Sequence, residues 1–221
     1  MSDEAEKYPS ERVTVHFEGK RCIHSRNCVL GDPRVFVPNA VGPWIHPEAV
    51  PVERVVELVH ACPSGALTYE RRDGAPGEAP APVNTVRVLE NGPLAFRAEM
   101  RFEGRGGALV RATLCRCGAS NNKPFCDNSH KASGFTATGE PATQDSQPLE
   151  RRNGVLEVIP VLDGPLHVKG SLEIVSGTGR TTNRVAEAWL CRCGGSAKKP
   201  YCDGTHKRNG FKAEGRAPIR K

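Results

Sequence analysis

Short alternating segments separated by glycine and proline dominate the hydrophobic pattern of this 221-residue chain. The first is Val13–Phe17, where apolar and polar residues alternate as they do in a half-buried strand. Similar segments recur at 95–102, 108–114, 168–175 and 185–190. We therefore expect an α+β fold that is rich in short strands.

One helix is predicted, over residues 52–61. Its valines lie at i, i+3, i+4 and i+7 and so form a single apolar face: Val52, Val55, Val56 and Val59. Pro51 suits the start of this helix. The helix ends at Cys62-Pro-Ser-Gly65, because proline and glycine stop it, and residues 66–69 can return as a strand.

A stretch that lacks packing residues divides the chain. Residues 74–84 are rich in glycine, alanine and proline, and predict an interdomain linker. Beyond it the chain is duplicated, because Asn91-Gly-Pro-Leu94 recurs as Asp163-Gly-Pro-Leu166 before similar strands. The predicted organisation is a flexible tail at 1–11, a small N-terminal domain at 12–73, and two related domains at 85–146 and 147–221.

Cysteine and histidine recur at one spacing in both related domains. The copies read CRCGASNNKPFCDNSH over 115–130 and CRCGGSAKKPYCDGTH over 191–206, so both have the form C-x-C-x8-C-x3-H. Thiolates bind soft metals and iron–sulfur clusters, and imidazole suits zinc or iron. The candidate ligands are Cys115, Cys117, Cys126 and His130 in the first copy, and Cys191, Cys193, Cys202 and His206 in the second.

Two kinds of metal site fit this ligand set. Structural zinc sites include sets of three cysteines and one histidine, but their cysteines are usually paired two to four residues apart. A C-x-C pair is tighter and suits two thiolates on one iron, with the third cysteine and the histidine on a second iron. The spacing favours a cluster over zinc and leaves zinc as the alternative.

The second copy resembles the CDGSH iron–sulfur domain family at every defining position, and the first differs by Asn128 in place of glycine. Asparagine is the non-glycine residue that best accepts a positive φ, so the tight turn remains feasible. The resemblance covers about residues 85–221 and implies a 2Fe–2S cluster in each half. Single-motif members form intertwined dimers with a β-cap, which implies a NEET-like pseudo-two-fold unit within this chain, an intramolecular pseudo-dimer.

The ligand set has chemical consequences. A neutral imidazole in place of an anionic thiolate raises the reduction potential above that of an all-cysteine plant-type ferredoxin. Protonation of the liganding nitrogen would release iron, so acid should labilise the cluster. The resemblance makes Asp127 and Asp203 acceptors that order the loop; the alternative, which is compatible with it, is that each caps the helical turn that follows. Ser120 and Ser196 either donate to a cluster sulfur or stabilise a turn.

Three cysteines, Cys22, Cys28 and Cys62, lie outside the repeat. Residues 12–70 resemble the divergent mono-cluster ferredoxin family in Cys22-Ile-His24-Ser-Arg-Asn-Cys28, Pro43-Trp44-Ile45 and Cys62-Pro-Ser-Gly-Ala66, which implies a small ferredoxin-like domain. Ser25 stands where a further cysteine would be, so the cluster is either 3Fe–4S or a 4Fe–4S cluster completed by another group. His24 is the candidate for that group, and the alternative is a histidine beside the cluster or on the surface.

Composition and charge limit the compartments and the partners that we expect for this protein. Nine cysteines, an odd number, follow an N-terminus without an apolar signal segment, so we expect a cytoplasmic protein with metal-bound cysteines. No apolar run reaches the length of a membrane span, so no membrane partner is expected. Residues 180–221 carry 11 Lys and Arg against 3 Asp and Glu. This basic end suits an acidic redox partner, and also nucleic acid.

Three functions are compatible with these features. The leading hypothesis is electron transfer or redox sensing with redox partner proteins, including a flavin-containing reductase. No nucleophile–base constellation is present, so no enzyme is predicted. The second hypothesis is storage of clusters or their transfer to apo-iron–sulfur proteins. The third is a zinc-stabilised nucleic-acid-binding module, which the scarcity of stacking aromatics disfavours: Trp189, Tyr201 and Phe211.

Overall fold

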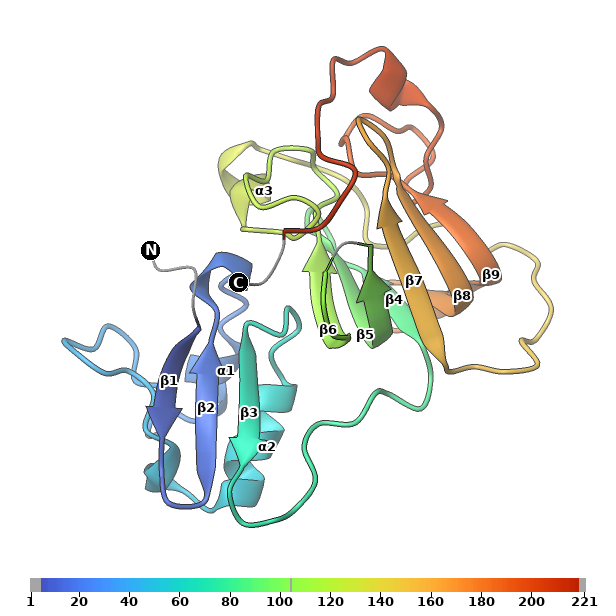
Figure 1. Ribbon diagram of the computed structural model, residues 1–221. Coiled ribbons are helices and arrows are strands. Elements are labelled where there is room, and N and C mark those ends of the chain that lie inside the picture. The colour runs from blue at the N-terminus through green and yellow to red at the C-terminus, as the bar shows by residue number, and fades with distance from the viewer. Residues whose placement is uncertain (1–4, 104, 219–221) are drawn as a thin grey trace. The chain divides into compact units, whose positions relative to one another are not determined.

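The computed structural model describes residues 5–103 and 105–218 (Figure 1). These residues fall into two compact units, one ending at Ala79 and the other beginning at Pro80. The division lies inside the predicted linker at 74–84. The fold is rich in strands with few helices, as the sequence pattern predicts. Among the described residues, no helix has the length and apolar character needed to cross a membrane.

The N-terminal unit is a small antiparallel sheet with two short helices. Its strands pair in the order β1-β2-β3. The elements are β1 (Glu6–Pro9), β2 (Val13–Phe17), α1 (Asn27–Gly31), α2 (Val52–His60) and β3 (Leu67–Arg71). The predicted strand at β2 is confirmed, and the predicted helix is confirmed as α2. Val52, Val55 and Val59 of its apolar face are buried in the core of this unit.

Strand β1 corrects the prediction of a flexible tail at 1–11. It pairs with β2 from Glu6↔Phe17 to Pro9↔Thr14. Its sequence, EKYP, shows no alternation because β1 is an edge strand whose side chains are mostly exposed. Residues 1–4 of the predicted tail, and 219–221 of the last predicted domain, lie outside the described residues.

The C-terminal unit combines both related domains in one sheet. Within the described residues this sheet has six strands: β4 (Thr85–Val88), β5 (Leu94–Phe102), β6 (Leu109–Leu114), β7 (Val155–Pro160), β8 (Leu166–Val175) and β9 (Thr181–Leu190). The long hairpins β5–β6 and β8–β9 are joined by the short strands β4 and β7, each of which pairs with both β5 and β8. A short helix, α3 (Ser129–Ala132), follows the first cysteine stretch.

The strand pairings of the two halves correspond. Val88 pairs with Leu94, and 72 positions later Pro160 pairs with Leu166. The crossing pairs correspond as well: Thr85↔Glu173 between β4 and β8 matches Glu157↔Arg101 between β7 and β5. Each half therefore contributes one strand to the other half, and neither is an independent domain.

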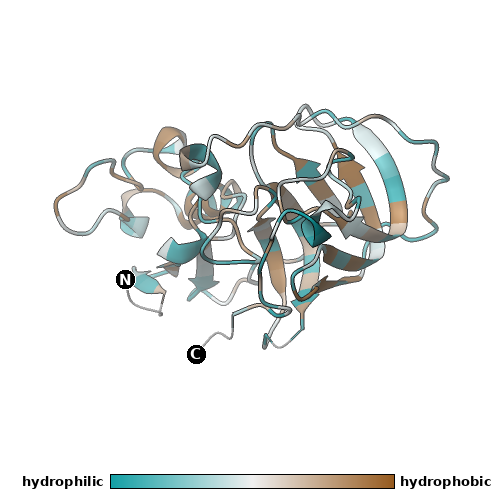
Figure 2. Cartoon of the chain, turned by 90° about the horizontal axis from the view of Figure 1, so that it is seen from above, coloured by the Kyte–Doolittle hydropathy of each residue, from teal (hydrophilic) through white to brown (hydrophobic). Residues whose placement is uncertain are grey.

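The apolar core of this unit lies on one face of these strands. Every second residue of β5 is buried: Leu94, Phe96, Ala98, Met100 and Phe102. Figure 2 shows the apolar residues concentrated on the strands and the polar residues on the connecting segments. Burial of each large apolar side chain stabilises the fold by about 1.5–3 kcal/mol. The core thus fixes the ends of β6 and β9, where Cys115 and Cys191 immediately follow.

Candidate metal centres

The first centre forms where the chain folds back beside the end of β6. The Cys115 amide donates to the Pro124 carbonyl at 2.8 Å, and the Cys126 amide donates to the Thr113 carbonyl at 2.9 Å. These two bonds place the third cysteine next to the first, although ten residues separate them. The second half repeats the arrangement, because Cys191 donates to Pro200 and Cys202 donates to Trp189, each at 2.8 Å.

The candidate donors form two pairs in each half. The sulfurs of Cys115 and Cys117 lie 3.7 Å apart, and Cys126 Sγ lies 3.4 Å from His130 Nδ1. In the second half the corresponding distances are 3.8 Å between Cys191 and Cys193, and 3.4 Å between Cys202 Sγ and His206 Nδ1. The structure therefore brings together all eight cysteine and histidine residues that the spacing predicts, as four pairs.

A left-handed turn places each histidine. Asn128 has φ 75° and the corresponding Gly204 has φ 84°, so asparagine adopts the positive φ that the sequence requires of it. The histidine follows two residues later, one helical turn beyond the third cysteine. Its Nδ1 faces the cysteine sulfur, which leaves Nδ1 as the candidate ligand atom.

Backbone amides point at the cysteine sulfurs. Ala119 N donates to Cys117 Sγ and Asn128 N donates to Cys126 Sγ, both at 3.4 Å. Gly195 N and Gly204 N donate in the same way, at 3.4 Å, to Cys193 and Cys202. Amide hydrogen bonds stabilise negative charge on sulfur, so they favour the thiolate that a metal requires.

The two aspartates close the ligand loops. Asp127 accepts from the amide of Asn121 at 2.8 Å, and from the amide and hydroxyl of Ser129 at 3.0 and 2.6 Å. Asp203 accepts equivalent bonds from Ala197 and Thr205. Hydrogen bonding, first from Thr205, lowers the pKa of Asp203 below its usual range. Each aspartate thus joins the start of its loop to the turn that carries the histidine.

The serines stabilise turns. Ser120 Oγ donates to the Phe125 carbonyl at 2.7 Å and accepts from the Asn122 amide at 3.0 Å. Ser196 Oγ donates to the Tyr201 carbonyl at 2.6 Å. A hydroxyl has one proton to donate, and here a carbonyl receives it. Of the two roles considered for these serines, the structure favours turn stabilisation over donation to a cluster sulfur.

Burial and hydrogen bonding shift the thiol pKa values in the first centre. The hydrogen bond between Cys115 and Cys117 raises the pKa of Cys115 well above its usual value and lowers that of Cys117 to about 7. Burial raises the pKa of Cys126 to about 12 and lowers the pKa of His130. Burial makes an uncompensated thiolate costly and keeps the imidazole neutral, and both effects suit a bound metal cation.

A buried arginine lies between the first two cysteines of each centre. Arg116 is 1% exposed, and its guanidinium donates to the carbonyls of Gly92, Thr138 and Leu89 at 2.5–2.9 Å. Arg192 makes the corresponding bonds to the carbonyls of Gly164, Glu214 and Val161. The sequence reasoning missed these residues, although the C-R-C repeat in both copies is the signal that could have found them.

The N-terminal cysteines come from three separate segments. Cys22 follows a 3-10 turn, Cys28 lies in α1 and Cys62 follows α2, and all three pack with the core of this unit. Burial raises the pKa of both Cys22 and Cys28, and each thiol also interacts electrostatically with Cys62. The structure therefore groups the three thiols as the sequence predicts.

The fourth position of this site is less well defined. The His24 backbone amide, and not its ring, approaches Cys22 Sγ at 3.4 Å, and the His24 side chain is exposed. Ser25 is exposed as well. Cys62 Sγ lies 3.5 Å from the Ser64 hydroxyl. Three cysteine donors are thus present, and the contact of His24 with them is through its backbone amide.

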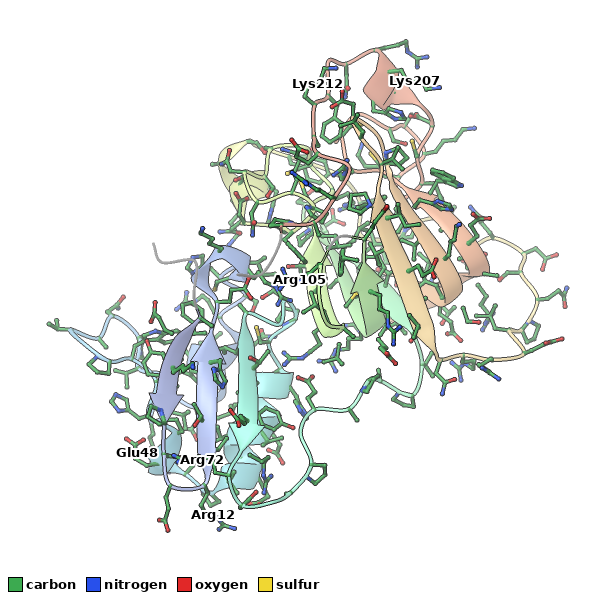
Figure 3. The ribbon with its side chains drawn as sticks, viewed as in Figure 1. Arg12, Glu48, Arg72, Arg105, Lys207 and Lys212 are labelled. Carbon is green, nitrogen blue, oxygen red and sulfur yellow. The ribbon has the colours of Figure 1, made fainter. Side chains whose placement is uncertain are left out.

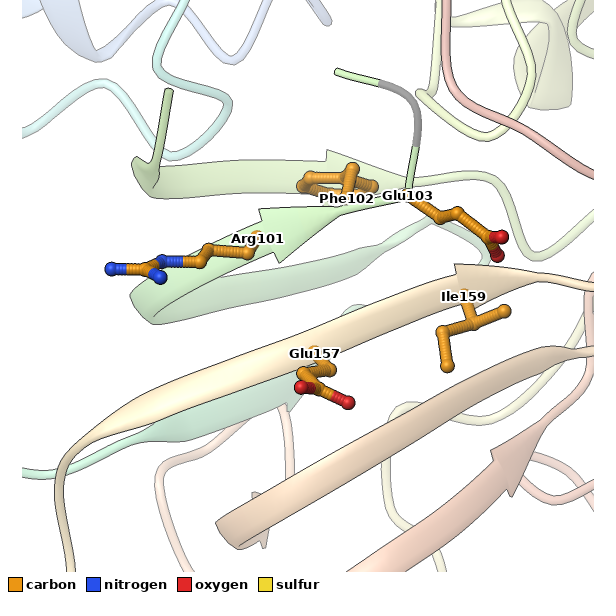
Figure 4. Close-up of a pocket in the computed structure, with 5 residues that line it drawn as sticks. All are labelled: Arg101, Phe102, Glu103, Glu157 and Ile159. Carbon is orange, nitrogen blue, oxygen red and sulfur yellow. The ribbon is translucent and has the colours of Figure 1, made fainter. Parts of the chain in front are cut away.

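Outside these centres, the described residues form a pocket at the seam between β5 and β7. Arg101, Phe102, Glu103, Glu157 and Ile159 line it. Figure 4 shows that Arg101 and Glu103 extend in opposite directions, so they do not converge on one point in the pocket. None of these five residues carries a thiol, hydroxyl or imidazole, so this pocket lacks the donor types of the cysteine and histidine centres.

Basic residues lie close to the second centre. Lys207 directly follows His206 and is exposed, and Lys131 is exposed at the corresponding position after His130. Figure 3 shows Lys207 and Lys212 on the C-terminal segment of this unit. Lys212 pairs with Asp163 at 2.8 Å. These lysines are therefore surface residues in the neighbourhood of the ligand loop.

Comparison with known proteins agrees with this division. A family model described as divergent 4Fe-4S mono-cluster matches residues 8–72, and one described as iron-binding zinc finger CDGSH type matches residues 83–131 and 163–207. The uncharacterized protein YjdI of Escherichia coli K12 is 42% identical over 65 residues, which are 29% of this chain and 84% of that protein. YjdI of Escherichia coli O157:H7 matches equally.

Both matched regions are iron–sulfur-binding domains, and they contain the thiols and imidazoles that the structure brings together. The chain thus belongs to the CDGSH iron-binding family through its C-terminal unit and to the divergent 4Fe-4S mono-cluster family through its N-terminal unit.

Proposed function

We propose that the protein transfers electrons or senses redox state through two 2Fe–2S clusters and one N-terminal cluster. The observation that carries this proposal is the division of each C-terminal donor set into a Cys–Cys pair and a Cys–His pair. One pair would hold each iron of a two-iron cluster. When bound, such a cluster supplies a one-electron couple, and the protein sets its potential.

The donor arrangement argues against a single zinc ion in each half. Structural zinc is held tetrahedrally by four donors around one point. A Cys–Cys pair and a Cys–His pair would give each iron of a two-iron cluster two protein ligands, so this pairing supports a cluster over a single zinc ion.

The matching strand registers support a pseudo-two-fold, NEET-like unit. The exchange of β4 and β7 between the halves would replace, within one chain, the dimer of single-motif proteins. The two clusters would then lie in related environments. Each would have a buried arginine nearby, Arg116 or Arg192, and backbone amides that donate to the cysteine sulfurs. These positive groups stabilise added negative charge and so raise the potential.

The N-terminal unit would hold the third cluster through Cys22, Cys28 and Cys62. Three protein thiolates suit a 3Fe–4S cluster, and they also suit a 4Fe–4S cluster whose fourth iron has another ligand. Because the His24 side chain is exposed, we favour a fourth position that no protein side chain occupies over ligation by His24. The basic C-terminal region would favour an acidic redox partner, of which a flavin-containing reductase is one class.

Stepwise reduction of the anaerobically purified protein tests this proposal. Visible absorption and EPR should show reversible one-electron reduction of 2Fe–2S centres, with potentials above the roughly −400 mV of plant-type ferredoxins. A second signal, lost in Cys62→Ser, should report the N-terminal cluster. A colourless protein that contains only stoichiometric zinc would refute the proposal.

Cluster transfer is the second candidate function, and the mixed Cys–His pair favours it. Imidazole can be protonated and released, so the histidine is the labile ligand. His206→Cys and His130→Cys should each slow transfer to an apo-ferredoxin, and Lys212→Met serves as a surface control. Unchanged transfer rates in both histidine variants would count against this function.

A further inference from the structure

The two ligand loops of the C-terminal unit touch each other at the backbone. Gly118 follows the ligand Cys117, and Gly194 follows the ligand Cys193. Gly118 has φ +85°, and a Cβ added there would lie 2.6 Å from the Cys193 carbonyl oxygen. A Cβ added to Gly194 would collide in the same way with the Cys117 carbonyl. Each loop therefore packs, without room for a methyl group, on a ligand residue of the other centre.

A reciprocal pair of cation–ring contacts crosses the same boundary. Lys123 Nζ of the first half lies 5.9 Å from the ring centroid of Phe211, which follows the second histidine. Lys199 Nζ of the second half lies 5.8 Å from the ring of Phe135, which follows the first histidine. The face of an aromatic ring attracts a cation, and the attraction is stronger where water is excluded.

Each lysine is also tied to its own ligand loop. Lys123 donates to the Ser120 carbonyl, and Lys199 donates to the Ser196 carbonyl at 2.5 Å. Each ring is bounded by a buried arginine of its own half as well, because Arg116 lies 5.4 Å from Phe135 and Arg192 lies 5.4 Å from Phe211. A lysine thus links the ligand loop of one centre to the segment after the histidine of the other.

We infer that the two metal centres are coupled, so that each is retained more firmly while the other is occupied. The inference rests on the proposed function and adds that the two clusters are lost together. Metal binding orders the residues that hold the metal. A loop that loses its metal would loosen its contact with the opposite ligand loop, and the coupling must be reciprocal at equilibrium.

Electrostatic interactions between buried groups cross the same boundary. The buried Arg116 guanidinium is close enough to interact with Cys191, and Arg192 is close enough to interact with Cys115.

The test compares the full-length protein with variants that lack one centre. Cys126→Ser removes a ligand from the first half, and Cys202→Ser removes the corresponding ligand from the second. An iron chelator is added in excess, and cluster loss is followed by visible absorbance and by the EPR signal of the reduced 2Fe–2S centre. The remaining cluster should be lost about five-fold faster, or more, than the clusters of the unaltered protein.

A second set of variants keeps every ligand. Lys199→Met removes the cation over Phe135 and should accelerate loss of both clusters severalfold, whereas Lys199→Arg keeps a cation and should retain the original rate. Lys198→Met is the matched control, because Lys198 is the exposed neighbour in the chain. Far-UV circular dichroism shows whether each variant is folded.

The outcomes are distinguishable. Loss of the remaining cluster at the unaltered rate from a folded single-centre variant, or equal rates for Lys199→Met and Lys198→Met, would overturn the coupling alone. Absence of iron and sulfide from the unaltered protein would overturn the proposed function, and the coupling with it.

Discussion

The two halves of the C-terminal unit share their ligand geometry and differ in the surface around it. Their Cys–Cys distances are 3.7 and 3.8 Å, and both Cys–His distances are 3.4 Å. In the second half, Trp189 is 46% exposed and stacks on His167 at 3.8 Å. The corresponding cross-strand pair of the first half is Thr113 and Ala95, and Thr113 is buried.

This difference distinguishes the residues that shape the ligand loop from the residues of the surrounding surface. The amide-to-sulfur bonds, the aspartate and the buried arginine occur in both halves, so they belong to the ligand loop itself. The aromatic pair lies next to only the second centre, since Trp189 directly precedes Leu190 and the ligand Cys191. We therefore expect matched substitutions of the shared features to have equal effects in the two halves. A substitution of a feature found in one half should affect that half.

The largest effect is expected from Arg116→Met. The change removes the charged donor from the carbonyls of Gly92, Thr138 and Leu89, of which Gly92 is buried, and each lost partner costs about 1–3 kcal/mol. We expect the free energy of unfolding to fall by about 4 kcal/mol, measured by urea unfolding followed by circular dichroism. Arg192→Met should cost a similar amount, and the exposed Arg208→Met should cost little. Very different costs for Arg116→Met and Arg192→Met would contradict the equivalence of the two loops.

A smaller effect is expected from Gly118→Ala. The new Cβ would meet the Cys193 backbone and would also occupy a positive φ, which together cost about 3 kcal/mol of unfolding free energy. Gly134→Ala is the matched control, because its φ is +64° and no atom lies within 4 Å of the added Cβ. It should cost only about 1–2 kcal/mol. Thermal unfolding of the two variants measures the difference, and equal midpoints would show that the loops are not in contact.

A third effect is expected from the ion pair between Glu173 and Arg152 in the second half. The buried carboxylate of Glu173 pairs with Arg152 at 2.7 Å, whereas Arg101, its counterpart 72 positions earlier, is exposed. The bond with Arg152 is the main cause that lowers the pKa of Glu173. Its stabilisation is therefore present above the unfolded pKa of about 4.3 and is lost as the pH falls through the lower, folded pKa.

Glu173→Gln should accordingly destabilise the protein by about 1 kcal/mol near pH 7. The difference from the unaltered protein should shrink as the pH is lowered below about 4.3. Urea midpoints of both proteins across this range give the comparison. A difference that stays constant down to acid pH would show that the charge of Glu173 makes no contribution.

The smallest effect is expected from Asn128→Gly, which makes the first turn like the second. Asn128 has φ 75°, and its buried Oδ1 has no hydrogen-bond partner within the part of the chain that is described. Removing that side chain should raise the free energy of unfolding by about 0.5–1 kcal/mol. The converse change, Gly204→Asn, should lower it by a similar amount. A loss of stability in Asn128→Gly would show that the asparagine side chain is needed in the first half.

Features that depend on nearby residues were predictable from the sequence. The four valines of α2 lie on one face because of the helical period alone. The alternation of β2 likewise depends only on neighbouring residues. The C-x-C-x8-C-x3-H spacing predicts the ligand set because the loop folds on itself. The positive φ of Asn128 follows from the same turn.

Features that depend on distant partners were not predictable. β1 is a strand only because β2 offers it an edge, and β4 and β7 are short strands whose parallel partners lie in the other half. The role of Arg116 was missed because its carbonyl acceptors lie more than 20 residues away along the chain. The cross-half contacts of Gly118 and Lys199 arise in the same way, from the exchange of strands.

Iron and acid-labile sulfide per chain, measured on anaerobically purified full-length protein, test the central claim most directly. Two 2Fe–2S clusters with a 3Fe–4S or 4Fe–4S cluster predict about seven or eight iron atoms, respectively, and about eight sulfides in either case, with no zinc. Zinc at one atom per C-terminal half, without sulfide, would contradict the account.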